Sequence, residues 1–178
     1  MRRYPVVSAL LVSVFALTLT APCQEKTEKP TVGWTMDPTE AKIPNSPVSG
    51  KVHGKNFQIA FTLHEKGGLV FRIAQGKKLP EETIDFNLFR TPKAKESLAG
   101  WTFVTSPKKN DSGKDPGIVI TSVQPGMDMP KMELLIPGEY ALKLEFGKVK
   151  DGIIAGKIYF ATKDKMTYVA GIFELKEE

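Results

Sequence analysis

The stretch PGEYALKLEFGKVKDGIIAGKIYFATKDKMTYVAGIFEL, residues 137–175, decides the fold. It contains three runs in which apolar residues alternate with polar ones, and a strand with this pattern buries one face and exposes the other. Asp151 and Gly152 separate the first two runs, and both residue types tolerate the positive φ of a tight hairpin turn. A second turn is expected at residues 162–165. We therefore expect a β-meander of three strands. The apolar residues expected to face the core are Tyr140, Leu142, Leu144, Phe146, Ile154, Ile158, Phe160, Val169, Phe173 and Leu175.

Shorter runs with the same alternation precede this meander, and residues that favour turns separate them. No stretch combines a helical period with capping residues, apart from a weak one at residues 91–99. Many short strands with a turn about every 8 to 12 residues are typical of sandwiches and barrels. The further strands expected are residues 48–52, 57–63, 69–73, 84–88, 101–104, 118–123 and 132–136.

Residues 136–142, Ile-Pro-Gly-Glu-Tyr-Ala-Leu, open the meander with a turn. This segment resembles the Pro-Gly-x-Tyr-x-Leu corner of immunoglobulin-like and related secreted β-sandwich modules. The resemblance implies that the Tyr140 hydroxyl bonds a backbone group at the turn between two sheets, and it favours a sandwich over a barrel. We therefore expect one antiparallel, immunoglobulin-like β-sandwich of about nine strands over residues 47–178.

The N-terminus has the three parts of a secretory signal peptide. Arg2 and Arg3 are its positive region, residues 6–19 are its apolar region, and small residues surround Ala21. The apolar region is about 14 residues long, whereas a membrane-spanning helix needs about 20. We therefore expect residues 1–23 to be removed and the protein to be secreted or periplasmic.

Cys23, the single cysteine of the chain, leaves a second possibility open. A cysteine at the end of the apolar run and before a polar segment resembles the bacterial lipoprotein signal, in which that cysteine is lipidated. Thr20 and Pro22 depart from that pattern. The alternatives are a soluble exported domain and a membrane-anchored lipoprotein, and a membrane is a partner only in the second. In either case the folded domain has no disulfide.

A second resemblance extends over most of the mature chain. Several of its segments are similar to uncharacterised secreted proteins of planctomycete-type bacteria, and no function is attached to that group. The segments that carry this likeness are residues 50–54, 144–147, 156–159 and 168–173.

Residues 24–46 are rich in Pro, Thr, Lys and Glu, which predicts a flexible linker with Trp34 as the residue that could pin it to the domain. The chain has 25 basic and 20 acidic residues; without the two arginines of the signal peptide the net charge is 25 − 2 − 20 = +3. Because the lysines are spread along the chain, we expect a solvated basic surface and no nucleic-acid partner.

The sequence contains no signature of a catalytic site. It has no Gly-x-Ser-x-Gly, His-Glu-x-x-His, phosphate-binding or dinucleotide-binding motif, and no cofactor is expected. His53 and His64 would lie about 23 Å apart along one hairpin, so both are expected at the surface. Asp111 and Asp115 have something of the spacing of a calcium loop, but three neighbouring lysines favour a plain flexible loop at residues 106–117. We therefore expect no enzyme activity.

Residues 126–132 contain three of the six methionines, Met127, Met129 and Met132. Thioether sulfurs select Cu(I), so this segment is a candidate copper site. Methionines also fill irregular gaps beneath loops, and neither the intervening Lys131 nor the lack of a nearby histidine suits copper. Both interpretations stay open from the sequence.

Tyr159 and Tyr168 are expected on the exposed face of the meander, among lysines. Such aromatic residues can stack on sugars or on a partner surface, although single exposed aromatics are also normal. The sequence therefore predicts a non-catalytic extracytoplasmic binding or structural module with an unknown protein or carbohydrate partner. The alternative is a periplasmic copper-binding protein.

Overall fold

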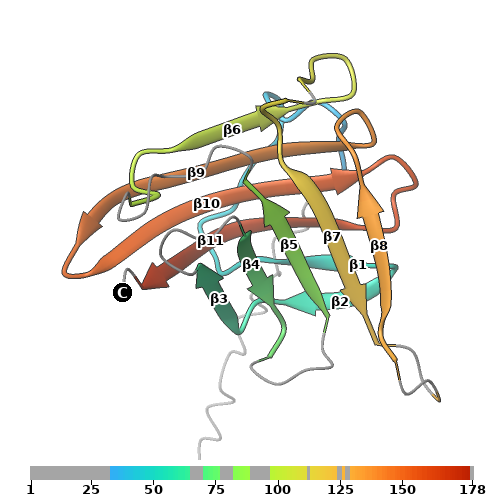
Figure 1. Cartoon of the computed structure of the whole chain (residues 1–178), viewed down its shortest axis with the longest axis horizontal. Coiled ribbons are helices and arrows are strands. Elements are labelled where there is room, and N and C mark those ends of the chain that lie inside the picture. The colour runs from blue at the N-terminus through green and yellow to red at the C-terminus, as the bar shows by residue number, and fades with distance from the viewer. Residues whose placement is uncertain are drawn as a thin grey trace, which may run out of the picture.

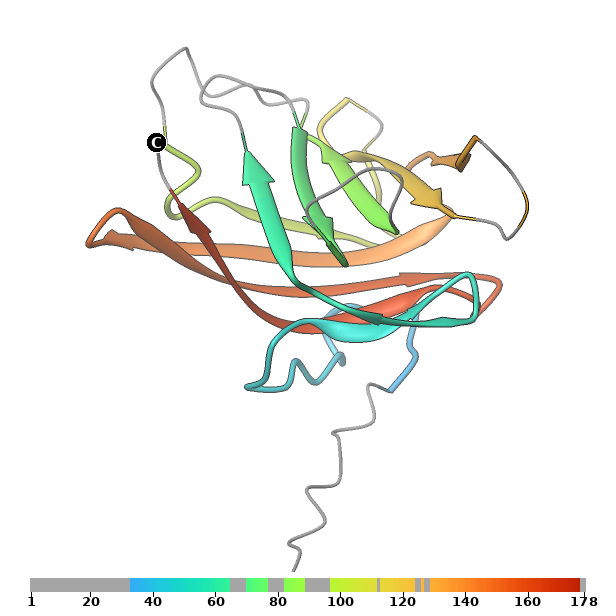
Figure 2. The same ribbon diagram turned by 90° about the horizontal axis from the view of Figure 1, so that it is seen from below.

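The structure of the protein is a computed structural model that describes residues 33–64, 70–76, 82–88, 97–111, 113–123, 126 and 129–176. These residues form eleven strands in two antiparallel sheets that face each other (Figures 1 and 2). The expected all-β sandwich is confirmed. Within the described ranges no helix of the length and hydropathy needed to cross a membrane occurs.

The larger sheet, sheet A, contains the predicted meander and has the strand order β2-β1-β11-β10-β9-β6. Three of its strands are long and the other three have four residues each. Its strands are β1 (Ser49–Val52), β2 (Lys55–Gln58), β6 (Thr102–Thr105), β9 (Tyr140–Lys150), β10 (Ile153–Thr162) and β11 (Tyr168–Lys176).

The smaller sheet, sheet B, has the order β3-β4-β5-β7-β8 and covers only part of sheet A, so the β9–β10 hairpin projects beyond it (Figure 1). Its strands are β3 (Phe61–His64), β4 (Val70–Ala74), β5 (Thr83–Asn87), β7 (Gly117–Ser122) and β8 (Lys131–Leu135).

The turn between β9 and β10 forms where the sequence predicts it. Asp151 and Gly152 have φ values of 53° and 73°, as a two-residue type I′ turn requires. The following strand pairs Phe160 with Leu142 on one side and with Val169 on the other, so all three face the core. The alternation in the sequence therefore predicts correctly which residues of the meander face the core, whereas the shift of the β9–β10 register between Ile154 and Gly156 was not predicted.

Aromatic rings from both sheets meet in the core. The Phe71 ring of β4 lies 5.1 Å from that of Phe146 and 5.0 Å from that of Phe173, both on sheet A. Phe86 of β5 contacts Phe160 of β10 edge to face at 5.8 Å. Burial of each ring stabilises the fold by a few kcal/mol, and ring geometry adds about 1 kcal/mol per pair.

The single strand expected at residues 57–63 is wrong, because the chain changes sheets within it. Phe57 is buried on sheet A, whereas Phe61 pairs with Ala74 on sheet B. The Ala60 N–H donates to the Ala74 carbonyl as well, so Ala60 is an extra residue in the ladder. This bulge reverses which residues face inward. It also makes two strands, β2 and β3, where one was expected.

After the bulge, the inward-facing residues of β3 are polar. Thr62 lies opposite Ile73, and His64 lies opposite Phe71, both of which are fully buried. Opposite residues in an antiparallel ladder share a face, so Thr62 and His64 point between the sheets. Leu63, which was expected inside, is on the outer face and 37% exposed.

Residues 33–46 lie against the outer face of sheet A, where Figure 2 shows the start of the described chain below the sheet. The Trp34 indole donates a hydrogen bond to the Thr162 carbonyl at 2.9 Å, and the Lys165 ammonium lies 4.6 Å from its ring. This part of the expected linker therefore packs on the domain, and residues 24–32 lie outside the described ranges. The side chains in contact are Trp34, Met36, Ala41 and Ile43 on one side and Ala141, Tyr159, Ala161, Tyr168 and Ala170 on the other.

The expectation that Tyr159 faces solvent is wrong. Residues 33–46 bury it completely, and its hydroxyl accepts the Thr35 N–H at 2.6 Å and donates to the Thr35 carbonyl at 2.8 Å. Burial raises the pKa of the Tyr159 hydroxyl, and the bond with Thr35 partly offsets that rise. Tyr168 is partly buried against the same segment.

Tyr140 is fully buried at the start of β9. Its hydroxyl donates a hydrogen bond to the carbonyl of Pro116, which directly precedes β7 on the other sheet. One side chain therefore links the two sheets. The wider resemblance to immunoglobulin-like modules stays an expectation.

Candidate binding groove

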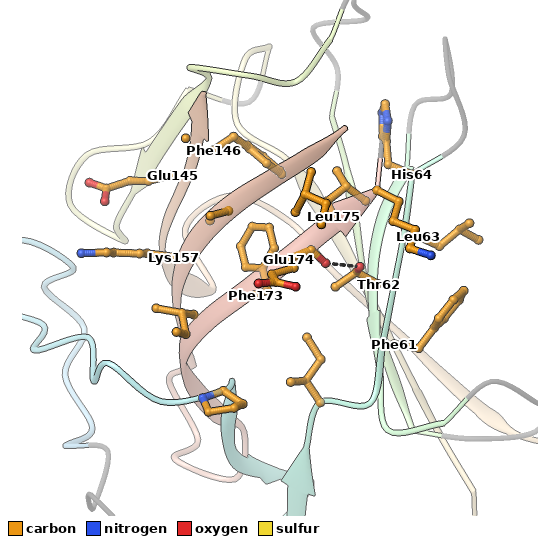
Figure 3. A pocket seen from close by; sticks show the side chains of 18 of the residues that line it. Phe61, Thr62, Leu63, His64, Glu145, Phe146, Lys157, Phe173, Glu174 and Leu175 are labelled. Atoms are coloured by element: carbon orange, nitrogen blue, oxygen red, sulfur yellow. Dashed lines mark hydrogen bonds between the residues drawn. The ribbon is translucent and has the colours of Figure 1, made fainter. Parts of the chain in front are cut away.

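A groove of about 1010 Å³ lies between β3 and the projecting ends of β9, β10 and β11 (Figure 3). It exists because sheet B ends at β3 while the meander continues past it. The groove opens where the two sheets part, next to the bulge at Ala60.

The floor of the groove is apolar. Phe146, Phe173 and Leu175 contribute inward-facing side chains that are each less than 5% exposed. Gly156 lies beneath Phe173, and a Cβ at this position would approach the ring to 2.1 Å. The absence of a side chain at Gly156 therefore leaves room for the tip of the Phe173 ring.

One wall of the groove is the main chain of β11. The Ile172 N–H donates to the Ser46 carbonyl, and the Ile172 carbonyl accepts the Val48 N–H, so Ile172 bonds away from β10. Alternate residues of a strand bond to the same side, so the main-chain groups of Glu174 and Lys176 have this direction too. The register with β1 does not extend to them, and they face the groove instead.

The other wall is the main chain of β3. The Gln75 N–H donates to the Glu82 carbonyl on the β5 side of β4. Because successive residues of a strand bond to opposite sides, the main-chain groups of Ala74 and Arg72 point to the β3 side. Their partners there are Phe61 and Leu63. The main-chain groups of Thr62 and His64 consequently point away from β4 and into the groove. The Thr62 hydroxyl donates to the Glu174 carbonyl at 2.6 Å, which joins the two walls at one point.

Charged residues of both signs lie along the strands that border the groove, and Figure 3 shows the side chains of Glu145 and Lys157 directed away from it. Glu145 and Lys157 are cross-strand partners on β9 and β10, and the Lys143 ammonium lies 3.2 Å from the Glu145 carboxylate. Glu174 and Lys176 add a further pair on β11.

The predicted copper ligands lie on the opposite edge of sheet B, at and before β8. Met129 is 78% exposed and Met132 is 68% exposed, so neither fills a gap in the core. Met127 lies outside the described residues, as does Cys23, the predicted lipidation site. Two of the three thioethers are therefore accessible, and the copper site stays a prediction.

The two histidines occupy different places. His53 lies in the turn between β1 and β2, and its Nε2 atom is 3.5 Å from the Glu133 carboxylate of β8. The His53 side chain is more buried than expected, at 21% exposure. His64 lines the groove (Figure 3). In the part of the chain that the structure describes, no three His, Cys, Asp or Glu side chains lie close enough to hold a metal ion.

The candidate calcium residues form a local turn. The Asp111 N–H donates to the Asp115 carboxylate at 2.5 Å, and the Gly113 N–H donates to the Asp111 carboxylate at 3.0 Å. The Lys114 ammonium lies 2.8 Å from the other Asp111 oxygen. Groups of the loop itself therefore occupy both carboxylates, and the loop is more ordered by hydrogen bonds than the sequence suggests.

The outer face of sheet B carries an ion pair that the sequence analysis missed. Arg72 and Asp85 are cross-strand partners joined by two hydrogen bonds of 2.6 Å. These bonds raise the pKa of the Arg72 guanidinium, while partial burial acts in the opposite direction. The two residues are 13 positions apart, and alternation alone cannot show which strands are neighbours.

None of the protein-family models, curated proteins and solved structures compared with this chain matches it. Its function is therefore inferred from the geometry of the groove and of the strand edges.

Proposed function

We propose that this chain is a non-catalytic extracytoplasmic binding module that takes an extended peptide segment of a partner protein into the groove beside β3. The observation that carries the proposal is the edge strand β3 beside an apolar groove. A peptide in extended conformation adds to a sheet edge through main-chain hydrogen bonds, and its alternate side chains enter adjacent pockets. Here the main chain of Thr62 on the β3 edge would supply hydrogen bonds, and the apolar lining of the groove would receive one peptide side chain in two.

A peptide fits the groove better than a carbohydrate does. Sugars bind by stacking on exposed aromatic faces, but Tyr159 is covered by residues 33–46 and Tyr168 is partly covered. The rings of Phe146 and Phe173 are almost fully buried, so they offer too little surface for stacking.

The proposal is tested with a phage-displayed library of heptapeptides and with a glycan array as the comparison. We expect the exported protein to enrich a consensus with alternating apolar residues. The substitution His64→Trp adds bulk in the groove and should abolish enrichment. The matched control is Gln58→Trp on β2, an exposed position that does not line the groove, and it should bind as the wild type does.

Circular dichroism and thermal unfolding of both variants establish that they fold. Binding that survives His64→Trp would place the peptide elsewhere and contradict the proposal. Binding to glycans without any peptide enrichment would contradict it as well.

We also propose that the domain catalyses no reaction. We expect panels of hydrolase and oxidoreductase substrates to stay at background, because the sequence has no catalytic motif and the ionisable group beside His53 is the Glu133 carboxylate. Turnover that disappears with His53→Ala or His64→Ala would overturn this part.

Copper binding is a second candidate, favoured by the exposure of Met129 and Met132, which leaves both sulfurs accessible. Replacing Met127, Met129 and Met132 by Leu nearly conserves volume, so stability should change little while Cu(I) binding is lost. A competition titration against a colorimetric Cu(I) chelator measures this. A wild-type protein that cannot compete with the chelator would exclude the copper function.

A further inference from the structure

Exposed apolar side chains gather on one edge of sheet B. Leu134 of β8 is 65% exposed, and Ile136 directly after the strand is 58% exposed. With Met129 and Met132, they form a row that we call the β8 stripe. β8 is the last strand of sheet B, and its ladder within the described residues is with β7. We infer that a second copy of this chain pairs with β8, antiparallel, across a two-fold axis at Met132.

The main chain of β8 is suited to this pairing. Successive residues of each strand direct their main-chain groups to opposite neighbours. Followed from the Gln75–Glu82 bond through β5 and β7, this rule makes Lys131, Glu133 and Leu135 the residues of β8 that bond to β7. Ile136 supports the assignment, because its N–H donates to the Glu139 carboxylate instead. Met132 and Leu134 therefore direct their N–H and carbonyl groups toward the open edge.

Charge selects the register of the pair. An axis at Met132 places Lys131 opposite Glu133 of the second copy, twice, so opposite charges meet. An axis at Glu133 would place two carboxylates opposite each other, which is destabilising. An axis at Leu134 would place Ile136 opposite Met132 and would need the Ile136 main chain for hydrogen bonds between the two copies. Glu139 already bonds both the N–H and the carbonyl of Ile136. The Met132 register avoids both faults, and it places Leu134 opposite Pro130, which accepts a hydrogen bond but cannot donate one.

The same edge limits the assembly to two copies. Pro130 and Pro137 flank the strand, and proline has no N–H to extend a ladder. A two-fold pair also uses the β8 edge of both copies, so no equivalent edge is left for a third. Because the paired segment is short, its area is small compared with the roughly 1,200 Å² of a stable interface. The dimer should therefore be weak and concentration-dependent.

Disulfide trapping tests the register directly. In an exported protein carrying Cys23→Ser, we introduce Met132→Cys. A hydrogen-bonded antiparallel pair holds its Cα atoms about 5.5 Å apart, which a disulfide can span. Leu134→Cys is the matched control, since the two Leu134 positions would lie about 14 Å apart, four residues along the pair. We expect at least a tenfold faster cross-link at position 132 under mild oxidation.

Sedimentation velocity across a concentration range tests the interface itself. Leu134→Lys introduces a charge into the β8 stripe and should keep the protein monomeric. The control is Val104→Lys, which changes a 45% exposed residue on the edge strand β6 and should leave the dimer intact. Lys131→Glu and Glu133→Lys should each weaken the dimer, and the double variant should restore it.

A protein that is monomeric at every concentration would overturn the inference. A dimer that tolerates Leu134→Lys as well as Val104→Lys would overturn it too, because its interface would then lie elsewhere. Faster cross-linking at position 134 than at position 132 would reject the Met132 axis. Thermal unfolding of each variant shows that lost association is not lost folding.

Discussion

Tyr140 connects the two sheets through a single hydroxyl, which makes it the most informative residue of the core. Its hydrogen bond to the Pro116 carbonyl is fully buried. In Tyr140→Phe that carbonyl loses its partner, so the free energy of unfolding should fall by about 1–3 kcal/mol. Urea unfolding followed by circular dichroism measures the loss. Tyr168→Phe serves as the control, and an equal loss there would show that the hydroxyl of Tyr140 has no special role.

Tyr140 also makes the protein sensitive to alkali. Burial raises the pKa of its hydroxyl, and the negative charge of Asp115 raises it further. Above about pH 10 the unfolded chain releases this proton while the folded protein retains it. The free energy of unfolding is therefore highest below about pH 10 and falls as the pH rises.

This alkaline loss should be smaller in Tyr140→Phe, which cannot ionise at that position. The slope of the urea midpoint between about pH 9 and pH 11 gives the comparison. Tyr159 contributes to the slope in both proteins, because burial raises its pKa too. Identical slopes would show that the Tyr140 hydroxyl ionises as readily in the folded protein as in the unfolded chain.

At the scale of elements, residues 33–46 act as a strap across the outer face of sheet A. Trp34 holds the strap by its indole hydrogen bond and by its contact with Lys165. Trp34→Ala should lower the free energy of unfolding by about 2 kcal/mol, below the ~3–5 kcal/mol of a fully buried tryptophan, because Trp34 is half-buried. It should also expose Lys42, which lies within the strap, to faster cleavage by trypsin.

Mass spectrometry of the tryptic fragments follows the cut after Lys42. The matched control is Thr39→Ala, which changes an exposed turn of the same strap, where Thr39 bonds Asp37. A cleavage rate that rises equally in both variants would show that Trp34 does not hold the strap in place.

The sequence predicts those elements that local chemistry determines. The meander follows from strict alternation and from the Asp151-Gly152 turn, and its inward-facing residues are correct. The change of sheet at Ala60 was missed, because a bulge adds one residue without any turn residue to mark it. Trp34 was expected to pin the linker to the domain, as it does, but the extent of the strap was not predicted, because its few apolar residues contact a face formed by strands more than 90 positions away.

The groove could not be predicted for a related reason. Its residues come from β3, β9, β10 and β11, and its volume depends on how far the meander projects past sheet B. Strand length was predictable, but the order of strands within each sheet was not. His64 was expected at the surface on alternation alone, and the bulge at Ala60 turned it toward the groove instead.

At the scale of the whole molecule, the two proposed interaction sites do not compete. Sheet B has the groove at its β3 edge and the β8 stripe at its other edge. A pair of copies joined through β8 would therefore leave both grooves open, one at each end of a continuous sheet. Such a dimer would bind a partner with two copies of the peptide more tightly than a monomer does, by raising the effective concentration of the second site.

The position of the strap also bears on membrane attachment. Because residues 33–46 pack on sheet A, a tether from Cys23 would consist of residues 24–32. Those nine residues could span at most about 32 Å when fully extended. A lipidated protein would therefore be held close to the bilayer.

Thr20 and Pro22 decide between this arrangement and a soluble protein. Both depart from the lipidation pattern beside the bond that would be cut, and we therefore expect the signal to be removed together with Cys23. Expressed in a bacterial host, the protein should fractionate with the periplasm or the medium, and Cys23→Ser should not change that fraction. Detergent-phase partitioning makes the measurement. Recovery in the detergent phase, with a shift to the aqueous phase on Cys23→Ser, would establish the lipoprotein instead, because the acyl chains on that cysteine are then what holds the protein to the membrane.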